Sequence, residues 1–199
     1  MGEFGTPQVD FHLSMAIEAV FSDRDGVIIE NRPNYVRTKE DAVFLPGALE
    51  SCARLADAGI PLILVTNQSA VGRGLVPLNV VEEIQQSVVE KIQAAGGNVS
   101  GSYLCPCTPE ENCDCRKPKP GMLIQAATEL GLNPINCVMV GDAITDLQAG
   151  WAVGCQGIMV ETGRGKEQWQ LLSESEMSKT IRVKEFSEAV DWVLETSRR

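Results

Sequence analysis

Short apolar runs alternate with longer segments of helical periodicity along this chain. The runs are mostly continuous rather than alternating, which is typical of strands buried on both faces of a sheet. They predict strands at residues 16–21, 60–65, 137–140 and 155–160, with weaker strands at 99–104 and 181–183. Strands that alternate with helices favour a doubly wound, mainly parallel sheet, so the pattern predicts an α/β fold.

The segments between these runs have helical spacing and end at glycines. Helices are expected to stop at Gly59, Gly96 and Gly131, another near Ala152, and a closing helix should cover residues 186–194. Two apolar stripes should face the core: Val81, Ile84, Val88 and Ile92 in one helix, and Ile124, Ala127 and Leu130 in another. Residues 27–44 lack such periodicity and are interpreted as a flap.

Length and composition fit one globular domain. The chain has 199 residues, of which 44% are hydrophobic and 22% charged. No apolar run approaches the roughly 18 residues that a membrane span needs, and no secretory pattern opens the chain. We therefore expect a cytoplasmic protein without a membrane partner. The net charge of −10 argues against a nucleic-acid partner, and we expect a monomer.

The first residues form a polar lead that is excluded from the fold. Residues 1–14 contain Gly and Pro without periodicity, so they are expected to be a disordered tail or an added segment, with residues 15–199 forming a single domain. The lead contains His12, the one histidine of the chain. A folded domain without imidazole disfavours Ser-His-Asp hydrolases, Cys-His proteases and histidine-ligated metal sites.

Acidic and hydroxyl side chains follow three of the predicted strands. They are Asp23 and Asp25 after the first, Thr66 and Asn67 after the second, and Asp142 with Asp146 after a later one. Because parallel strands place their carboxyl ends at one edge, these side chains should converge. Carboxylates can hold Mg²⁺ there, and a hydroxyl can donate to a phosphoryl oxygen. Each pair alone could be a helix cap or a solvated acidic turn, but their joint occurrence favours a phosphate site.

A phosphate site in an acidic chain needs local positive charge. Arg116, Lys117 and Lys119 form a basic cluster interrupted by prolines. Lysine acts on a phosphate as a point charge and arginine as a bidentate fork. A basic run is often only a solvated face, but this one directly follows a cysteine-rich loop, which favours a held position.

That loop, at residues 105–115, contains four of the seven cysteines: Cys105, Cys107, Cys113 and Cys115. Four soft ligands in two close pairs suit tetrahedral Zn²⁺, whereas a disulfide scaffold is unusual in a cytosolic chain. The Cys-x-Cys spacing is tighter than the common Cys-x-x-Cys, and a redox pair is the alternative. Cys52, Cys137 and Cys155 lie on apolar faces and are interpreted as core residues.

With these residues assembled, the chain resembles the haloacid dehalogenase superfamily. Within it, the chain is similar to the D-glycero-D-manno-heptose 1,7-bisphosphate 7-phosphatases and the related histidinol phosphatases. The resemblance covers about residues 16–165, and its motifs lie at residues 21–27, 34–36, 44–47, 65–69, 72–74, 113–122 and 140–142. It implies a Rossmann-like fold without a large cap domain and with a zinc-binding loop.

The resemblance also implies roles for individual residues. Asp23 would be the nucleophile and Asp25 the general acid and base, while Thr66 and Lys117 would contact the phosphoryl group. Mg²⁺ would be held by Asp23, the Asp25 carbonyl and Asp142. Substrate contacts would come from Asn34, Tyr35, Asn67, Gln68, Ser69 and Arg116.

Three positions depart from the family pattern. Cys107 stands where many relatives have histidine, so the zinc site here would be all-cysteine, and Ala143 stands where some relatives have lysine. The flap is one residue longer before Tyr35, so the resemblance assigns no contacts to Asn31 and Arg32.

These inferences predict a Mg²⁺-dependent phosphatase that removes the 7-phosphate of heptose 1,7-bisphosphate through an aspartyl-phosphate. Arg116, beside Lys117, is free to bind a second anionic group, which favours a bisphosphate. Histidinol phosphate, cationic at its far end, or another small sugar phosphate is the nearest alternative. From other classes, a phospho-receiver domain would not be expected to carry Asp-x-Asp on its first strand, and a zinc-ribbon interaction module would leave the acids unexplained.

Overall fold

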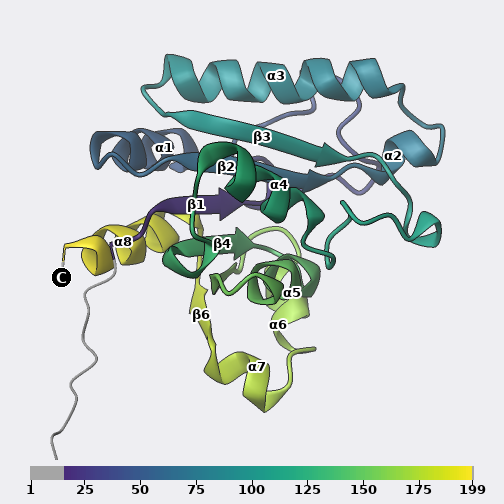
Figure 1. Cartoon of the computed structure of the whole chain (residues 1–199). Helices are drawn as coiled ribbons and strands as arrows, with labels where there is room; N and C mark the ends of the chain where they lie inside the picture. The colour runs from purple at the N-terminus through teal and green to yellow at the C-terminus, as the bar shows by residue number, and fades with distance from the viewer. Residues whose placement is uncertain (1–15, 199) are drawn as a thin grey trace, which may run out of the picture.

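Six parallel strands form one sheet in the order β3-β2-β1-β4-β5-β6 in the computed structural model, which describes residues 16–198 (Figure 1). The strands are β1 (Ala19–Ser22), β2 (Leu62–Asn67), β3 (Val99–Cys105), β4 (Cys137–Gly141), β5 (Gln156–Val160) and β6 (Thr180–Val183). The order reverses between β1 and β4, the switch point where ligands of such sheets bind. The prediction of a doubly wound parallel sheet is confirmed.

Helices cover both faces of this sheet. The described residues contain α1 (Ala48–Asp57), α2 (Ser69–Gly72), α3 (Leu78–Ala94), α4 (Gly121–Leu130), α5 (Ile144–Ala152), α6 (Gly165–Trp169), α7 (Glu174–Ser178) and α8 (Phe186–Ser197), with 3-10 turns η1 (Pro109–Glu111) and η2 (Pro134–Asn136). One face packs against α1, α3 and α8, and the opposite face against α4 and α5. None of the described helices is both long and apolar enough to cross a membrane.

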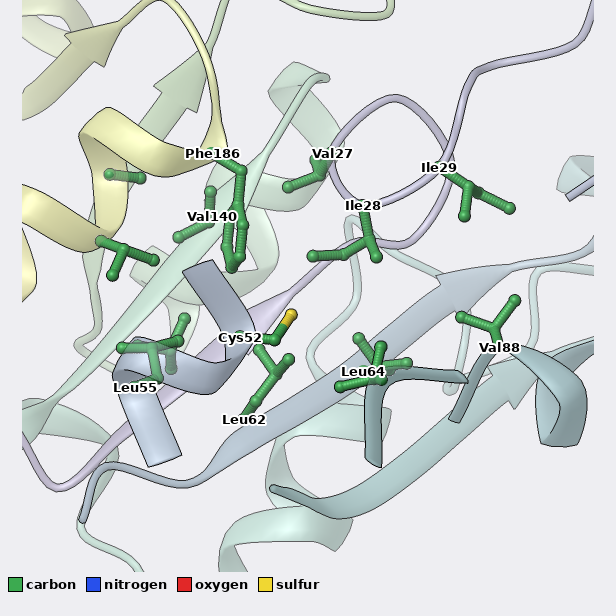
Figure 2. Close-up of a cluster of buried hydrophobic side chains, with 14 of the residues drawn as sticks. Val27, Ile28, Ile29, Cys52, Leu55, Leu62, Leu64, Val88, Val140 and Phe186 are labelled. Carbon is green, nitrogen blue, oxygen red and sulfur yellow. The ribbon is translucent and has the colours of Figure 1, made fainter. Parts of the chain in front are cut away.

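Alternate strand residues supply two separate cores, which explains why the strands are apolar throughout. Leu62 and Leu64 of β2 belong to the first core, whereas Ile63 and Val65 belong to the second. Figure 2 shows the first core, where side chains of the sheet meet those of the helices that cover it: Leu62, Leu64 and Val140 from the strands, Cys52 and Leu55 from α1, Val88 from α3 and Phe186 from α8.

One predicted stripe is confirmed and the other is partly wrong. Val81, Ile84, Val88 and Ile92 of α3 are all buried. In α4, however, Ile124 is 51% exposed and Leu130 lies at the exposed carboxyl end. The helix instead buries Met122, Leu123, Ala126 and Ala127, so the face that packs on the second core lies one position earlier than the predicted stripe.

The connection between β1 and α1 lies beside the carboxyl edge of the sheet and lines part of the cavity there. Within residues 16–198 this connection contains no helical cap, and two isolated bridges, Asp25–Ile29 and Ile29–Phe44, hold it in place. Its start is not a loose flap, since Val27, Ile28 and Ile29 are fully buried in the first core. The lead at residues 1–14, with His12, lies outside the described residues.

Candidate active site

Three carboxylates meet at the carboxyl edge of the two central strands. Asp23 follows β1 and its main-chain N–H donates to Val140 of β4 at 2.9 Å, so the strand pairing itself places it beside Asp142. Asp146 comes from the first turn of α5. One ligand oxygen from each of these acids lies within 4.8 Å of the others, and all three side chains are buried.

The three buried carboxylates affect one another's ionisation. Burial, together with the nearby Asp23 and Asp146 carboxylates, raises the pKa of Asp142 to about 7. Burial also raises the pKa of Asp146, although Lys117 opposes the shift. Clustered, buried oxygen ligands with a net negative charge fit a hard divalent cation such as Mg²⁺.

Lys117 is the buried cation of the site. Its side chain is 2% exposed, and its Nζ donates to Asp23 at 2.9 Å and to the Val65 carbonyl at 2.6 Å and lies 2.7 Å from an Asp146 oxygen. Burial alone would lower the pKa of Lys117, but the two carboxylates outweigh it and raise that pKa. Asn67 fixes the Lys117 main chain, donating to its carbonyl at 3.0 Å and accepting from its N–H at 3.1 Å.

Asp25 lies at the other side of the same opening, with its carboxylate held by three side chains. Gln68 donates to Asp25 Oδ2 at 2.8 Å and Thr66 at 3.3 Å. The guanidinium of Arg24 donates through Nε at 3.0 Å and through Nη2 at 3.2 Å. The Asp25 side chain is 19% exposed, so it can exchange protons with a ligand while remaining oriented by protein donors.

These groups open into a cavity of about 250 Å³. Residues named from the sequence that line it are Asp23, Asp25, Tyr35, Thr66, Asn67, Gln68, Ser69, Arg116 and Lys117. Asp142 is fully buried beside them. Asn34 lines a neighbouring hollow with Arg37 and Asp41 instead. Asn31, Arg32, Thr145, Asp146 and Arg164 also line the main cavity.

Arg164 is a site residue that no sequence motif indicated. It follows β5 and reaches Asp142 with its main-chain N–H at 2.9 Å and with Nη2 at 3.1 Å. The approach requires two glycines, because a Cβ on Gly26 or Gly163 would collide with the Asp142 carboxylate. Gly26 and Gly163 also have positive φ angles of 94° and 57°, a conformation that favours glycine.

The cysteine cluster lies beside this cavity. Its four sulfurs lie within 4.8 Å of one another, and Cys105 Sγ is 2.8 Å from Cys115 Sγ and 3.4 Å from Cys113 Sγ. Burial would raise the pKa of Cys113, but hydrogen bonds with the other thiols lower it to about 7. Four converging sulfurs fit a tetrahedral Zn²⁺ ion. Cys52, Cys137 and Cys155 are buried in the cores, as predicted.

Comparisons with known proteins agree with this geometry. A family model described as HAD-hydrolase-like matches residues 114–189. A D-glycero-β-D-manno-heptose-1,7-bisphosphate 7-phosphatase of Pseudomonas aeruginosa is 40% identical over 151 residues, covering 76% of this chain and 85% of the relative. Its counterpart in Yersinia pestis is 33% identical over 192 residues, covering 86% and 99%.

The chain belongs to the heptose bisphosphate phosphatase family of HAD-like hydrolases. A solved structure of a family member, the D,D-heptose 1,7-bisphosphate phosphatase of Bordetella bronchiseptica in complex with magnesium and phosphate, superposes with a TM-score of 0.83 at 30% identity. The match covers 89% of this chain and 98% of that one. The resemblance inferred from the sequence motifs is thereby confirmed.

Proposed function

We propose that this protein is a Mg²⁺-dependent phosphatase that removes the 7-phosphate of D-glycero-D-manno-heptose 1,7-bisphosphate. The observation that carries the proposal is the pairing of Asp23 with the buried Lys117 in the lining of a cavity that further cations also line. Relatives with this name, one of them solved with magnesium and phosphate, support the same activity.

Asp23 acts as the nucleophile in this proposal. Its carboxylate oxygen attacks phosphorus in line, the bond from phosphorus to the sugar oxygen breaks, and an aspartyl-phosphate forms. Lys117 Nζ and Thr66 Oγ1 donate to the phosphoryl oxygens, whose charge they offset in a site that excludes most water. Mg²⁺, held by Asp23, the Asp25 carbonyl and Asp142, would supply further charge stabilisation and orient the phosphate.

Asp25 moves the protons. As the sugar departs, the Asp25 carboxyl gives its proton to the leaving oxygen. In the second half, Asp25 takes a proton from water, the water oxygen attacks phosphorus, and the bond to Asp23 breaks to release inorganic phosphate. The contacts of Arg24 support this role, because its buried guanidinium holds the carboxylate at the cavity from outside the cavity lining.

The distribution of cations favours a substrate with two phosphates. Lys117 serves the reacting phosphoryl group, while Arg32, Arg116 and Arg164 line the same cavity. Arg116 Nη1 donates to the Cys107 carbonyl at 2.9 Å, so the other N–H groups of this guanidinium can donate to a ligand. A cationic far end, as in histidinol phosphate, would meet repulsion there.

A comparison of kcat/KM for heptose 1,7-bisphosphate, histidinol phosphate and a sugar monophosphate tests the substrate. We expect the bisphosphate to be preferred by at least about a hundredfold, the scale of two charge-assisted contacts. Product analysis should show loss of the 7-phosphate. A preference for histidinol phosphate would contradict the assignment of heptose bisphosphate as the substrate but not the phosphatase activity.

We further propose that the cysteine cluster holds one structural Zn²⁺ ion. Four protein ligands would close its coordination shell, so the ion would shape the loop and take no part in phosphoryl transfer. Seven cysteines that remain free within the described residues are consistent with a reducing, cytoplasmic setting. Elemental analysis of purified protein should find about one zinc per chain; a metal-free protein with an intact loop would reject the site.

A further inference from the structure

Arg24 is a charged residue without exposed surface, placed in sequence between the two acids of the site. Its relative exposure is 0%, and it is the largest fully buried side chain described. A buried guanidinium is costly unless its charge is paired and its donors are satisfied. Asp25 supplies the paired charge, accepting from Nε and Nη2.

Gln85 of α3 accepts a hydrogen bond from Nη1, the remaining nitrogen of this guanidinium. Arg24 Nη1 donates to Gln85 Oε1 at 2.7 Å, and Gln85 Nε2 donates to Ser102 Oγ of β3 at 2.7 Å. The other buried residues of α3, a helix described in full, are apolar. Because its amide has an acceptor at one end and a donor at the other, both contacts together fix the orientation of Gln85.

This chain of contacts differs from the other contacts of Asp25. Thr66 and Gln68 also line the cavity, so a bound phosphate competes for their donors. Arg24 is fully buried and is not among the lining residues, so its contact with Asp25 is not open to competition from a ligand in the cavity. In the described part of the chain, Gln85 reaches the site only through Arg24.

We propose that Gln85 is a positioning residue that holds Arg24, and through it the Asp25 carboxylate, in the geometry for proton transfer. The inference rests on the proposed function, since it assigns Asp25 the protonation of the leaving oxygen. Removing the Gln85 amide lets the Arg24 fork rotate, so Asp25 loses its alignment with the sugar oxygen. Attack by Asp23 and contacts of Lys117 stay intact.

The dependence of kcat/KM on the leaving group tests this role, because this ratio reports the steps up to departure of the alcohol. Heptose bisphosphate releases an oxygen that needs a proton, whereas p-nitrophenyl phosphate releases a stable anion. We expect Gln85→Met to lower kcat/KM about tenfold for the sugar, a part of the usual gain from general acid catalysis, and less than about threefold for the aryl phosphate.

Two further variants make the test specific. Gln85→Glu keeps an oxygen acceptor for Arg24 and should restore most of the sugar activity. Gln86→Met, at the next and exposed position of the same helix, should leave both substrates unaffected. If Gln85→Met does not fold, Ser102→Ala is the substitute, because it removes the hydrogen-bond partner of Gln85 on β3. It should lower kcat/KM for the sugar relative to kcat/KM for the aryl phosphate, by a smaller factor than Gln85→Met.

Equal losses for the two substrates, or unchanged kinetics in a folded Gln85→Met protein, would overturn the role of Gln85 and leave the phosphatase intact. Absence of any phosphatase activity in the unmodified protein would instead reject the proposed function, and this inference with it.

Discussion

The acidic cluster and the cysteine cluster each gather side chains that favour a cation, yet the protein holds them by different means. Asp23, Asp142 and Asp146 are buried, and their main chains extend from paired central strands or a helix end. Of the four clustered cysteines, Cys105 is buried at the end of β3, while Cys107, Cys113 and Cys115 lie half-buried on the loop between β3 and α4.

This difference suggests separate roles, with catalysis in the acidic cluster and the shape of the binding site in the cysteine loop. The pairing of β1 with β4 and the start of α5 bring the three acids together, although like charges repel one another. The cysteine loop packs on the second core through its own four cysteines, so its conformation depends on what joins the sulfurs. Arg116 and Lys117 link the two regions: Lys117 is anchored among the acids, whereas Arg116 is anchored on the loop. Changes in the first region should affect turnover, and changes in the second should affect substrate binding.

Asp23→Asn should produce the largest effect. The amide keeps the shape of the side chain but cannot act as a nucleophile, so kcat should fall by at least about a hundredfold. Asp25→Asn should lose a similar factor. Thermal unfolding should show that both variants remain folded, and Asp57→Asn, an exposed acid of α1, is the matched control. Near-normal turnover by purified Asp23→Asn protein would disprove the mechanism.

Arg116→Ala should have the next largest effect, and a selective one. Losing a charge-assisted contact to the second phosphate should cost about 1.5–3 kcal/mol, or roughly ten- to a hundredfold in kcat/KM, for the bisphosphate alone. Lys119→Ala is the matched control, since that partly exposed cation of the same cluster pairs with Asp114. Equal losses for mono- and bisphosphates would show that Arg116 serves only the reacting phosphate.

Sequence patterns could predict the sheet and most of the site because both depend on short-range signals. Continuous apolar runs located the strands, and the parallel order then placed Asp23, Thr66 and Asp142 on one edge. The buried face of α4 could not be obtained in this way, since Ile124 and Leu123 are equally apolar and packing on the second core decides which of them is buried. The short helices α6 and α7, five residues each, gave no periodic signal.

Side-chain pairs between residues far apart in the sequence could not be predicted either. Arg164 binds Asp142 from 22 positions further along the chain, and Arg24 binds Gln85 across 61 positions. Neither pair has a local pattern, because a single arginine resembles any solvated cation in a sequence. The glycine pair Gly26 and Gly163 carried a weak signal, but its reason, close approach to Asp142, needs the fold.

Magnesium affinity should depend on pH at the acidic cluster. The raised pKa of Asp142, about 7, results from burial and the neighbouring carboxylates. The metal binds the ionised carboxylate, so protons compete below that pKa, and affinity should fall by up to about tenfold for each pH unit below about 7. Calorimetric titration at about pH 6 and about pH 8 measures this; equal dissociation constants would contradict it.

Loss of the zinc site should give the smallest effect on turnover. In a Cys113→Ser variant we expect weaker zinc binding and a looser loop, so that Arg116 loses its anchor on the Cys107 carbonyl and KM for the bisphosphate rises severalfold. The value of kcat should change little, because Lys117 remains held by Asp23, Asp146 and Asn67.

Cys155→Ala is the control for stability alone: its thiol is buried in the second core, so the variant should unfold at a lower temperature with KM unchanged. A fall in kcat with KM unchanged in Cys113→Ser would show that the loop contributes to the chemical step and that the two regions are not separable.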